Sequence, residues 1–210
     1  LWACVLPKET TNLCVNSSFE YGSAGWGTIQ AGTIGTISQF QQFGAWSGSM
    51  APTSNGTSGA KSPTWTAGNG TDYTISAYVR GANAIPYRMA VADSAGINFV
   101  SGGTTTFTGG GTWQRYSMSY SEASGATRTV VITKNSSADT SAFYIDGVQI
   151  EVGSISSYTD GDQPGGTWLG AQHASTSIRS GQYRGGGSVI ALADLGLSVD
   201  QLDITKEVVF

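Results

Sequence analysis

The sequence predicts an all-β protein, a jelly-roll β-sandwich followed by an irregular Gly-rich C-terminal extension. Only 11% of the 210 residues are charged, which leaves little material for exposed helices with paired Glu and Lys side chains. Thirty residues are glycine, and serine and threonine are abundant. Between residues 16 and 151, extended runs alternate with clusters of Gly, Asn or Ser at the spacing typical of sandwiches and jelly rolls.

Six runs in this region are predicted to be strands. The clearest is 73–80, where the odd positions from Tyr73 to Val79 are apolar and the even positions from Thr74 to Arg80 are mostly polar. This alternation is typical of a strand with one buried face. The other predicted strands are 33–39, 87–93, 113–120, 127–133 and 142–151.

We divide the chain into an N-terminal segment (1–15), the sandwich (16–152) and the Gly-rich extension (153–210). The extension contains the run Gly185-Gly186-Gly187 and scattered aromatic residues, with no periodic apolar pattern. Irregular segments of this length usually pack on another part of the structure. We therefore expect residues 153–210 to be ordered mainly by contact with neighbouring subunits or domains.

Charge and hydropathy exclude two classes of partner. The net charge of −4 provides no basic surface for nucleic acid. No stretch approaches the 18 consecutive apolar residues of a membrane-spanning helix, so we predict no membrane span. The two cysteines, Cys4 and Cys14, lack the neighbours of a zinc site, and either two free thiols or a disulfide is compatible with their spacing.

Signals for catalysis are scarce, and we predict a protein that is not an enzyme. His173 is the one histidine, and the serines near it lack the Gly-x-Ser-x-Gly motif of a nucleophile elbow. A carboxylate pair could cleave a glycosidic bond. Sequence spacing does not show which two of the acidic residues would approach each other. The acidic residues considered are Glu20, Glu122, Asp146 and Glu151.

Two of these carboxylates suggest a calcium site. Calcium binds several oxygen ligands, and Glu20 and Asp146 would converge if the first and last strands of the sandwich were neighbours. The alternative is that one carboxylate caps a backbone segment and the other lies in a turn.

Aromatic side chains suggest a second kind of site, one that binds carbohydrate. The apolar face of a sugar ring stacks on an aromatic ring while polar groups bond its hydroxyls. Tyr78 lies on the polar face of the strand 73–80, and Trp65 and Tyr87 lie in or beside predicted loops. We take these three as candidate carbohydrate-binding residues that should be exposed. Packing in the core is the alternative for each.

Several motifs occur in an order that resembles the β-jelly-roll carbohydrate-binding modules that accompany xylanases and glucanases. The resemblance covers about residues 12–153. Its motifs are Asn16-Ser17-Ser18-Phe19-Glu20, Gly25-Trp26, Gly44-Ala45-Trp46-Ser47-Gly48-Ser49-Met50, the strand 73–80, Trp113-Gln114-Arg115, and residues 143–151.

This resemblance implies two packed antiparallel sheets and a structural calcium that bridges the first motif to the last strand. Carried over by position, it implies Glu20 and Asp146 as side-chain ligands. Gly147 stands where family members often have a second acidic residue, so this sequence lacks that additional ligand.

The stretch 158–180, which includes Asp160-Gly161-Asp162-Gln163-Pro164-Gly165, is similar to a segment that follows such jelly rolls in minor tail proteins of tailed bacteriophages. This similarity implies a non-enzymatic structural or adhesive component of the virion. Its expected partners are other phage tail proteins and host surface glycans, and it is expected to form homo-oligomers. The alternative is an ancillary carbohydrate-binding module of a secreted glycoside hydrolase.

Overall fold

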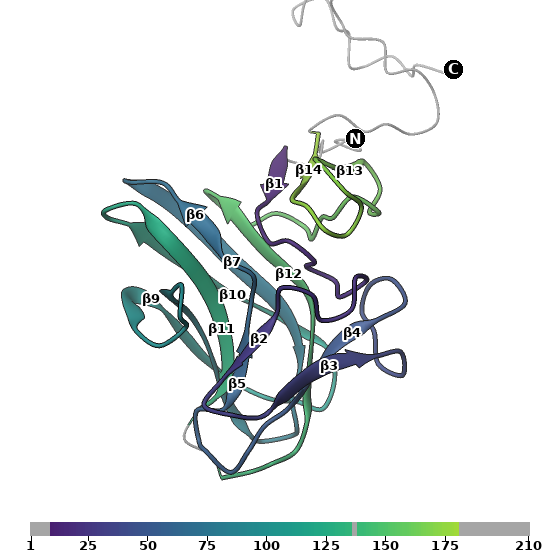
Figure 1. The fold of residues 1–210 in the computed structure, drawn as a ribbon, viewed down its shortest axis with the longest axis vertical. Helices are drawn as coiled ribbons and strands as arrows, with labels where there is room; N and C mark the ends of the chain where they lie inside the picture. The colour runs from purple at the N-terminus through teal and green to yellow at the C-terminus, as the bar shows by residue number, and fades with distance from the viewer. Residues whose placement is uncertain (1–8, 136–137, 181–210) are drawn as a thin grey trace, which may run out of the picture.

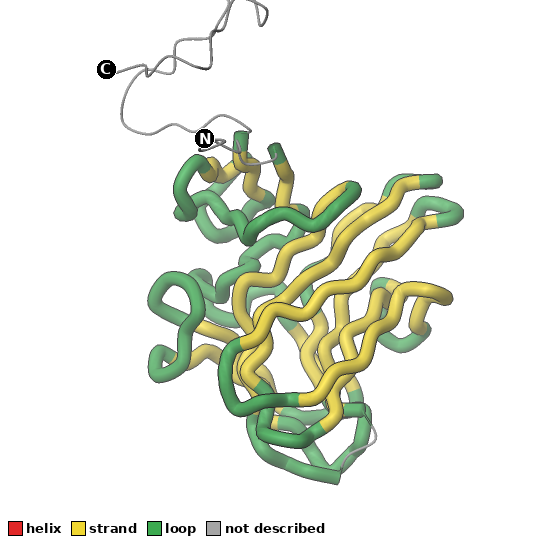
Figure 2. Tube along the Cα trace, turned by 180° about the vertical axis from the view of Figure 1, so that it is seen from behind, coloured by secondary structure: helices red, strands yellow, loops and turns green. Residues whose placement is uncertain are grey.

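The computed structural model describes residues 9–135 and 138–180, and the regular secondary structure in these ranges is all β-strand (Figure 2). The strands are β1 (Thr10–Asn12), β2 (Gly27–Ile29), β3 (Thr33–Ile37), β4 (Ser47–Ala51), β5 (Gly59–Lys61), β6 (Trp65–Ala67), β7 (Thr71–Arg80), β8 (Pro86–Asp93), β9 (Phe99–Thr108), β10 (Gln114–Glu122), β11 (Ala126–Lys134), β12 (Phe143–Val152), β13 (Gly166–Trp168) and β14 (Ser177–Arg179). Within the described ranges, no helix is long and apolar enough to cross a membrane.

Two antiparallel sheets pack against each other to form the sandwich (Figure 1). The five-stranded sheet has the order β10-β7-β12-β4-β3, and the other sheet has the order β2-β5-β11-β8-β9 with β6 also paired to β11. The predicted all-β jelly-roll class is therefore confirmed. We call the two sheets the β7 sheet and the β8 sheet after their long central strands.

The core lies between the sheets and is built by alternation along the strands. In β7 the side chains of Tyr73, Ile75 and Val79 are buried in it, as the sequence pattern predicts. All six predicted strands exist, with ends within two residues of the prediction. The even positions of β7 differ from the prediction, because Thr74 and Ser76 are also buried.

The sequence pattern missed β9, a ten-residue edge strand of the β8 sheet. Its centre is a run of glycines and threonines from Gly102 to Thr106, which offers no alternation of large apolar side chains. Backbone pairing with β8 holds β9 in place, since the Gly and Thr side chains bury little apolar surface. The result is a strand that no local pattern identifies.

A third sheet joins the two ends of the described chain. Strand β14 lies between β1 and β13, so residues 10–12 pair with residues 177–179 (Figure 1). Tyr158, Thr159 and Asp160 are buried against the sandwich. The expectation that the extension is ordered mainly by neighbours is therefore wrong for residues 153–180. Residues 181–210 of that expectation lie outside the described part.

One buried amide connects these parts. The side chain of Asn12 is fully buried, and its Nδ2 donates to the carbonyl oxygens of Val148 (3.0 Å) and Thr159 (3.1 Å). Its Oδ1 accepts hydrogen bonds from the backbone N–H groups of Cys14 (3.0 Å) and Ile150 (3.1 Å). Both donors and both acceptor positions of the amide are used. Asn12 thus ties β1 to β12 and to the extension.

An ion pair between the buried Glu122 and the half-buried Arg128 fixes the strands β10 and β11 at their connection. Arg128 donates from Nε and Nη2 to the two carboxylate oxygens of Glu122, at 2.7 and 3.0 Å. Tyr120 also donates to this carboxylate. The hydrogen bonds from Arg128 lower the pKa of Glu122 to about 2, against an ordinary value of 4.5. The ionised form is therefore strongly preferred in the folded protein.

We expect Asn12→Ala to lower the free energy of unfolding by about 3 kcal/mol or more, because it leaves several buried backbone groups unpaired. Urea unfolding measures this loss, and hydrogen exchange should show faster exchange in residues 158–180. Asn69→Ala is the control, since Asn69 is exposed. Wild-type stability of Asn12→Ala, with unchanged protection of residues 158–180, would show that the amide does not hold the extension.

We expect Glu122→Gln to lower the free energy of unfolding at pH 7 by about 2–4 kcal/mol, because it leaves Arg128 without its partner. The lowered pKa means that wild type has this stabilisation above about pH 4.5 and loses it as the pH falls towards about 2. Urea unfolding at pH 7 and pH 3 should show a smaller acid-dependent loss in the variant. Asp72→Asn, which removes an exposed carboxylate, is the control. Equal acid dependence in Glu122→Gln and wild type would contradict this assignment.

Candidate functional site

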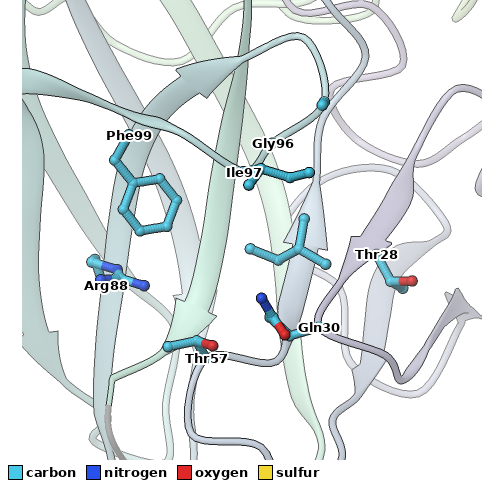
Figure 3. A pocket seen from close by; sticks show the side chains of 9 residues that line it. Thr28, Gln30, Thr57, Arg88, Gly96, Ile97 and Phe99 are labelled. Atoms are coloured by element: carbon cyan, nitrogen blue, oxygen red, sulfur yellow. The ribbon is translucent and has the colours of Figure 1, made fainter.

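A cleft of about 510 Å³ opens on the outer face of the β8 sheet, away from the core (Figure 3). It runs between the end of β2 and the turn that connects β8 to β9. The lining residues are Thr28, Ile29, Gln30, Thr57, Arg88, Ala95, Gly96, Ile97 and Phe99. Ile29 also packs in a small buried cluster with Ala90, Ala92 and Val131. These small apolar side chains lie on the outer face of the β8 sheet.

One wall of the cleft is the turn 93–98, which is held by its own hydrogen bonds. Asp93 accepts from the backbone N–H of Ile97 (3.0 Å) and from the side-chain amide of Asn98 (2.5 Å). These bonds lower the pKa of Asp93 below its ordinary value. Lys61 donates to the carbonyl oxygens of Ser94 and Ala95. The turn therefore presents the exposed Ile97 side chain from a defined position.

The opposite wall is the turn after β2. Gln30 and Ala31 both have positive φ (+53° and +63°), a conformation that is uncommon for residues other than glycine. Gln30 accepts a hydrogen bond from Asn55 through Oε1 at 3.3 Å. Its amide nitrogen remains available on the cleft side, where Thr57 also lies (Figure 3).

Arg88 and Phe99 form the charged part of the cleft. The Arg88 guanidinium lies 4.2 Å from the centroid of the Phe99 ring, as a cation–π contact (Figure 3). Its Nε is buried and has no hydrogen-bond partner within the described ranges. Burial lowers the pKa of Arg88, but a guanidinium keeps its charge at neutral pH. The cleft thus combines apolar surface from Ile97 and Phe99 with unused hydrogen-bond donors.

Two of the three aromatic candidates are not exposed, and the expectation for them is wrong. Tyr87 is fully buried between Phe107 and Phe143, with ring centroids at 5.8 and 5.2 Å. Trp65 is 6% exposed and lies edge-on to Tyr73. Both side chains point into the core because they occupy inward positions of β8 and β6. Neither can stack on a ligand from solvent.

Tyr78 is half-buried on the outer face of the β7 sheet, on the opposite side of the sandwich from the cleft. The edge of Phe43 meets its ring at a centroid distance of 5.1 Å, and the Arg115 guanidinium lies 5.7 Å from the ring centroid. Gly147, at φ +53°, allows this approach, because a Cβ there would lie 2.6 Å from the Phe43 ring. Part of the Tyr78 ring is therefore covered by its own chain.

The structure brings Glu20 and Asp146 to one loop, residues 42–46. Glu20 Oε1 accepts from the backbone N–H groups of Ala45 and Trp46, both at 2.8 Å. The buried Asp146 accepts through Oδ2 from the N–H groups of Gln42 (2.8 Å) and Phe43 (2.9 Å). Both carboxylates therefore anchor the same loop to the sandwich.

The pair also fits the carboxylate part of a site for a hard cation. Burial, with the nearby charge of Glu20, raises the pKa of Asp146 to about 7 despite the backbone donors. A cation would offset the repulsion that Glu20 adds at Asp146, and these two residues are the ones that would hold it. The remaining oxygen ligands would come from backbone carbonyls or water. Among the described residues no three or more His, Cys, Asp or Glu side chains gather in one place.

The other acidic candidates already have protein partners. Glu122 is paired with Arg128, and Glu151 accepts hydrogen bonds from Thr10, Gln149 and the N–H of Ser156. This use of the carboxylates favours a structural role.

His173 and Cys14 also have structural surroundings. The Nδ1 of His173 lies 3.4 Å from Asp162, and its ring meets Trp168 edge-on. Cys14 is a free, buried thiol whose pKa burial raises to about 12, so it is poorly reactive. Cys4 lies outside the described residues.

No protein-family model matches this sequence, and no curated protein matches it. Solved structures are similar in fold at low sequence identity. The arabinose-bound MgGH51 α-L-arabinofuranosidase matches with a TM-score of 0.58 and 12% identity, over 69% of this chain and 27% of that chain. Tailspike protein 4 of bacteriophage CBA120 matches at 0.52 and 15%, over 67% of this chain and 21% of that chain.

The CBM22-1 xylan-binding domain of Paenibacillus barcinonensis Xyn10C matches with a TM-score of 0.50 and 16% identity, over 73% of this chain and all of that domain. The matched region thus spans about a quarter of the first two proteins and the whole of this module. Identities this low show the fold alone. The chain has the jelly-roll fold of a carbohydrate-binding module, a fold also found within larger proteins.

We propose that Glu20 and Asp146 bind calcium, and we expect calcium to raise the melting temperature by mass action on the folded state. The raised pKa means that the folded protein keeps a proton on Asp146 that the unfolded chain releases. The stability from this proton is full below about pH 3.8 and is lost as the pH rises through about 7. Because calcium needs the ionised carboxylate, its effect should be larger at pH 8 than at pH 5.

Thermal unfolding with calcium or with a chelator measures this effect. Asp146→Asn should remove the calcium dependence, whereas the exposed control Asp72→Asn should keep it. A melting temperature of wild type that is the same in calcium and in chelator at both pH values would leave the two carboxylates as loop anchors only.

Proposed function

We propose that this chain is a non-catalytic carbohydrate-binding module that binds a glycan in the cleft of the β8 sheet. The observation that carries the proposal is the composition of the cleft. Phe99 and Ile97 are 36% and 71% exposed there, and Thr28, Gln30 and Arg88 lie around them. Exposed apolar surface beside hydrogen-bonding groups is what recognition of a sugar ring requires.

The fold supports this proposal. Similar solved structures include modules described as xylan-binding, but a shared jelly roll is compatible with many functions. The structural use of Glu122, Glu151 and Asp146 supports a role in binding rather than hydrolysis.

For the biological setting, we propose an adhesive or structural component of a phage tail, located in the virion. The segment 158–180 supports this placement through its similarity to phage minor tail proteins. Other tail proteins, host surface glycans and further copies of the chain are the partners that such a component would contact. The second candidate, an ancillary module of a secreted glycoside hydrolase, is favoured by the similarity in fold to the xylan-binding module.

The class of glycan distinguishes the two settings. The chain, multimerised to compensate for weak single-site affinity, can be tested on an array of bacterial surface glycans and plant cell-wall polysaccharides. Binding confined to bacterial glycans supports the phage setting, and binding confined to plant polysaccharides supports the hydrolase setting. Binding to neither class would contradict the proposed function.

We expect Phe99→Ala to weaken glycan binding at least tenfold, because it removes the aromatic surface of the cleft. Titration of the best glycan from the array measures the affinity. Tyr78→Ala is the matched control. Tyr78 lies on the β7 sheet, and it is the aromatic candidate that the sequence predicted on the polar face of the strand 73–80. Loss of binding in Tyr78→Ala, with wild-type binding in Phe99→Ala, would move the site to the β7 sheet.

A further inference from the structure

The charge of the cleft points to the chemistry of its ligand. Arg88 is the one charged side chain among the described residues that line it. The neighbouring Asp93 uses both carboxylate oxygens inside the turn 93–98, and Lys61 donates to backbone carbonyls of that turn. A chain with a net charge of −4 therefore presents a positive group, with no lining carboxylate, at this site.

Arg88 differs from the arginines that have structural roles. Arg115 donates to Ser76 and to the carbonyl of Ser156, and Arg128 donates to Glu122. The side chain of Arg88 makes no hydrogen bond to another described residue, although its Nε is buried. A buried donor without a partner destabilises the folded protein, and an acceptor bound at the guanidinium would offset that cost.

Phe99 determines how these donors are presented. The guanidinium carbon lies 4.2 Å from the centroid of the Phe99 ring, and this contact holds the guanidinium group beside the ring. Two parallel N–H groups match the two oxygens of a carboxylate. Gln30, Thr28 and Thr57 lie across the same cleft, where they can bond sugar hydroxyls (Figure 3).

We propose that the cleft selects an acidic glycan, whose carboxylate pairs with the Arg88 guanidinium while the sugar ring packs beside Phe99 and Ile97. This inference rests on the proposed function and names its ligand class. Neutral sugars would leave Arg88 without an ionic partner in a partly desolvated position. An acidic sugar supplies both the charge and the acceptor geometry that the cleft lacks.

The test uses matched pairs of ligands. The chain is titrated with oligogalacturonate, oligoguluronate and sialyl oligosaccharides, each beside its carboxyl-reduced form, and with inorganic phosphate as a simple anion. We expect at least one acidic oligosaccharide to bind at least tenfold more tightly than its reduced form. Raising the salt concentration from 50 to 300 mM should weaken binding of the acidic ligand more than binding of the neutral one, because salt screens the interaction between charges.

The variants locate the effect. Arg88→Gln should remove the preference for the acidic form, and Arg88→Lys, which keeps the charge but not the planar donors, should keep only part of it. Arg80→Gln is the matched control, because Arg80 stacks on Phe40 at 4.0 Å on the opposite sheet and carries the same charge. The melting temperature of each variant verifies that it is folded.

The outcomes separate the two proposals. Equal or tighter binding of the neutral forms would overturn the acidic specificity and leave the carbohydrate-binding function intact. An equal loss of preference in Arg80→Gln and Arg88→Gln would show a general charge effect and would also overturn the assignment to this cleft. If inorganic phosphate binds as tightly as the acidic sugars, the cleft is an anion site without glycan selectivity, and the proposal of an acidic glycan is overturned. No binding to any glycan, here or on the array, would contradict both proposals.

Discussion

The buried amide of Asn12 is the contact on which the organisation of the described chain depends. Its four hydrogen bonds join the N-terminal strand, the strand β12 and the segment after the sandwich. With these three parts connected, β14 can pair with β1, and Tyr158 can be buried against the sandwich. The segment that composition marks as irregular becomes part of the same folded unit, because polar bonds replace the apolar core that it lacks.

This arrangement makes the two outer faces of the sandwich different. The face of the β7 sheet is covered in part by residues 40–46 and by the extension, which place Phe43 against Tyr78 and Ser156 against Arg115. The face of the β8 sheet keeps an open cleft. The asymmetry assigns structural contacts to one sheet and leaves surface for a ligand on the other.

Ionisable groups are few in this protein, and most have protein partners. Glu122 is paired with Arg128, and Asp146 with Glu20 anchors a loop. Arg88 stands apart because its guanidinium group is partly desolvated and has no hydrogen-bond partner among the described residues. A scaffold with so few charges makes an unpaired one a strong determinant of which ligands the surface accepts, since nearby residues do little to neutralise it.

The sequence by itself determined the all-β class and the long strands of the sandwich, because the alternation from Tyr73 to Val79 depends only on neighbours in the chain. The resemblance to carbohydrate-binding modules also implied that Glu20 and Asp146 act together, and in the structure both carboxylates anchor the loop 42–46. Only the tertiary structure decided the burial of Tyr87 and Trp65, the existence of β9 and the position of the cleft. These features depend on which strands pair and which faces pack together. A local pattern carries no information about partners that are distant in sequence, so the same aromatic residue can belong to a core or to a binding surface.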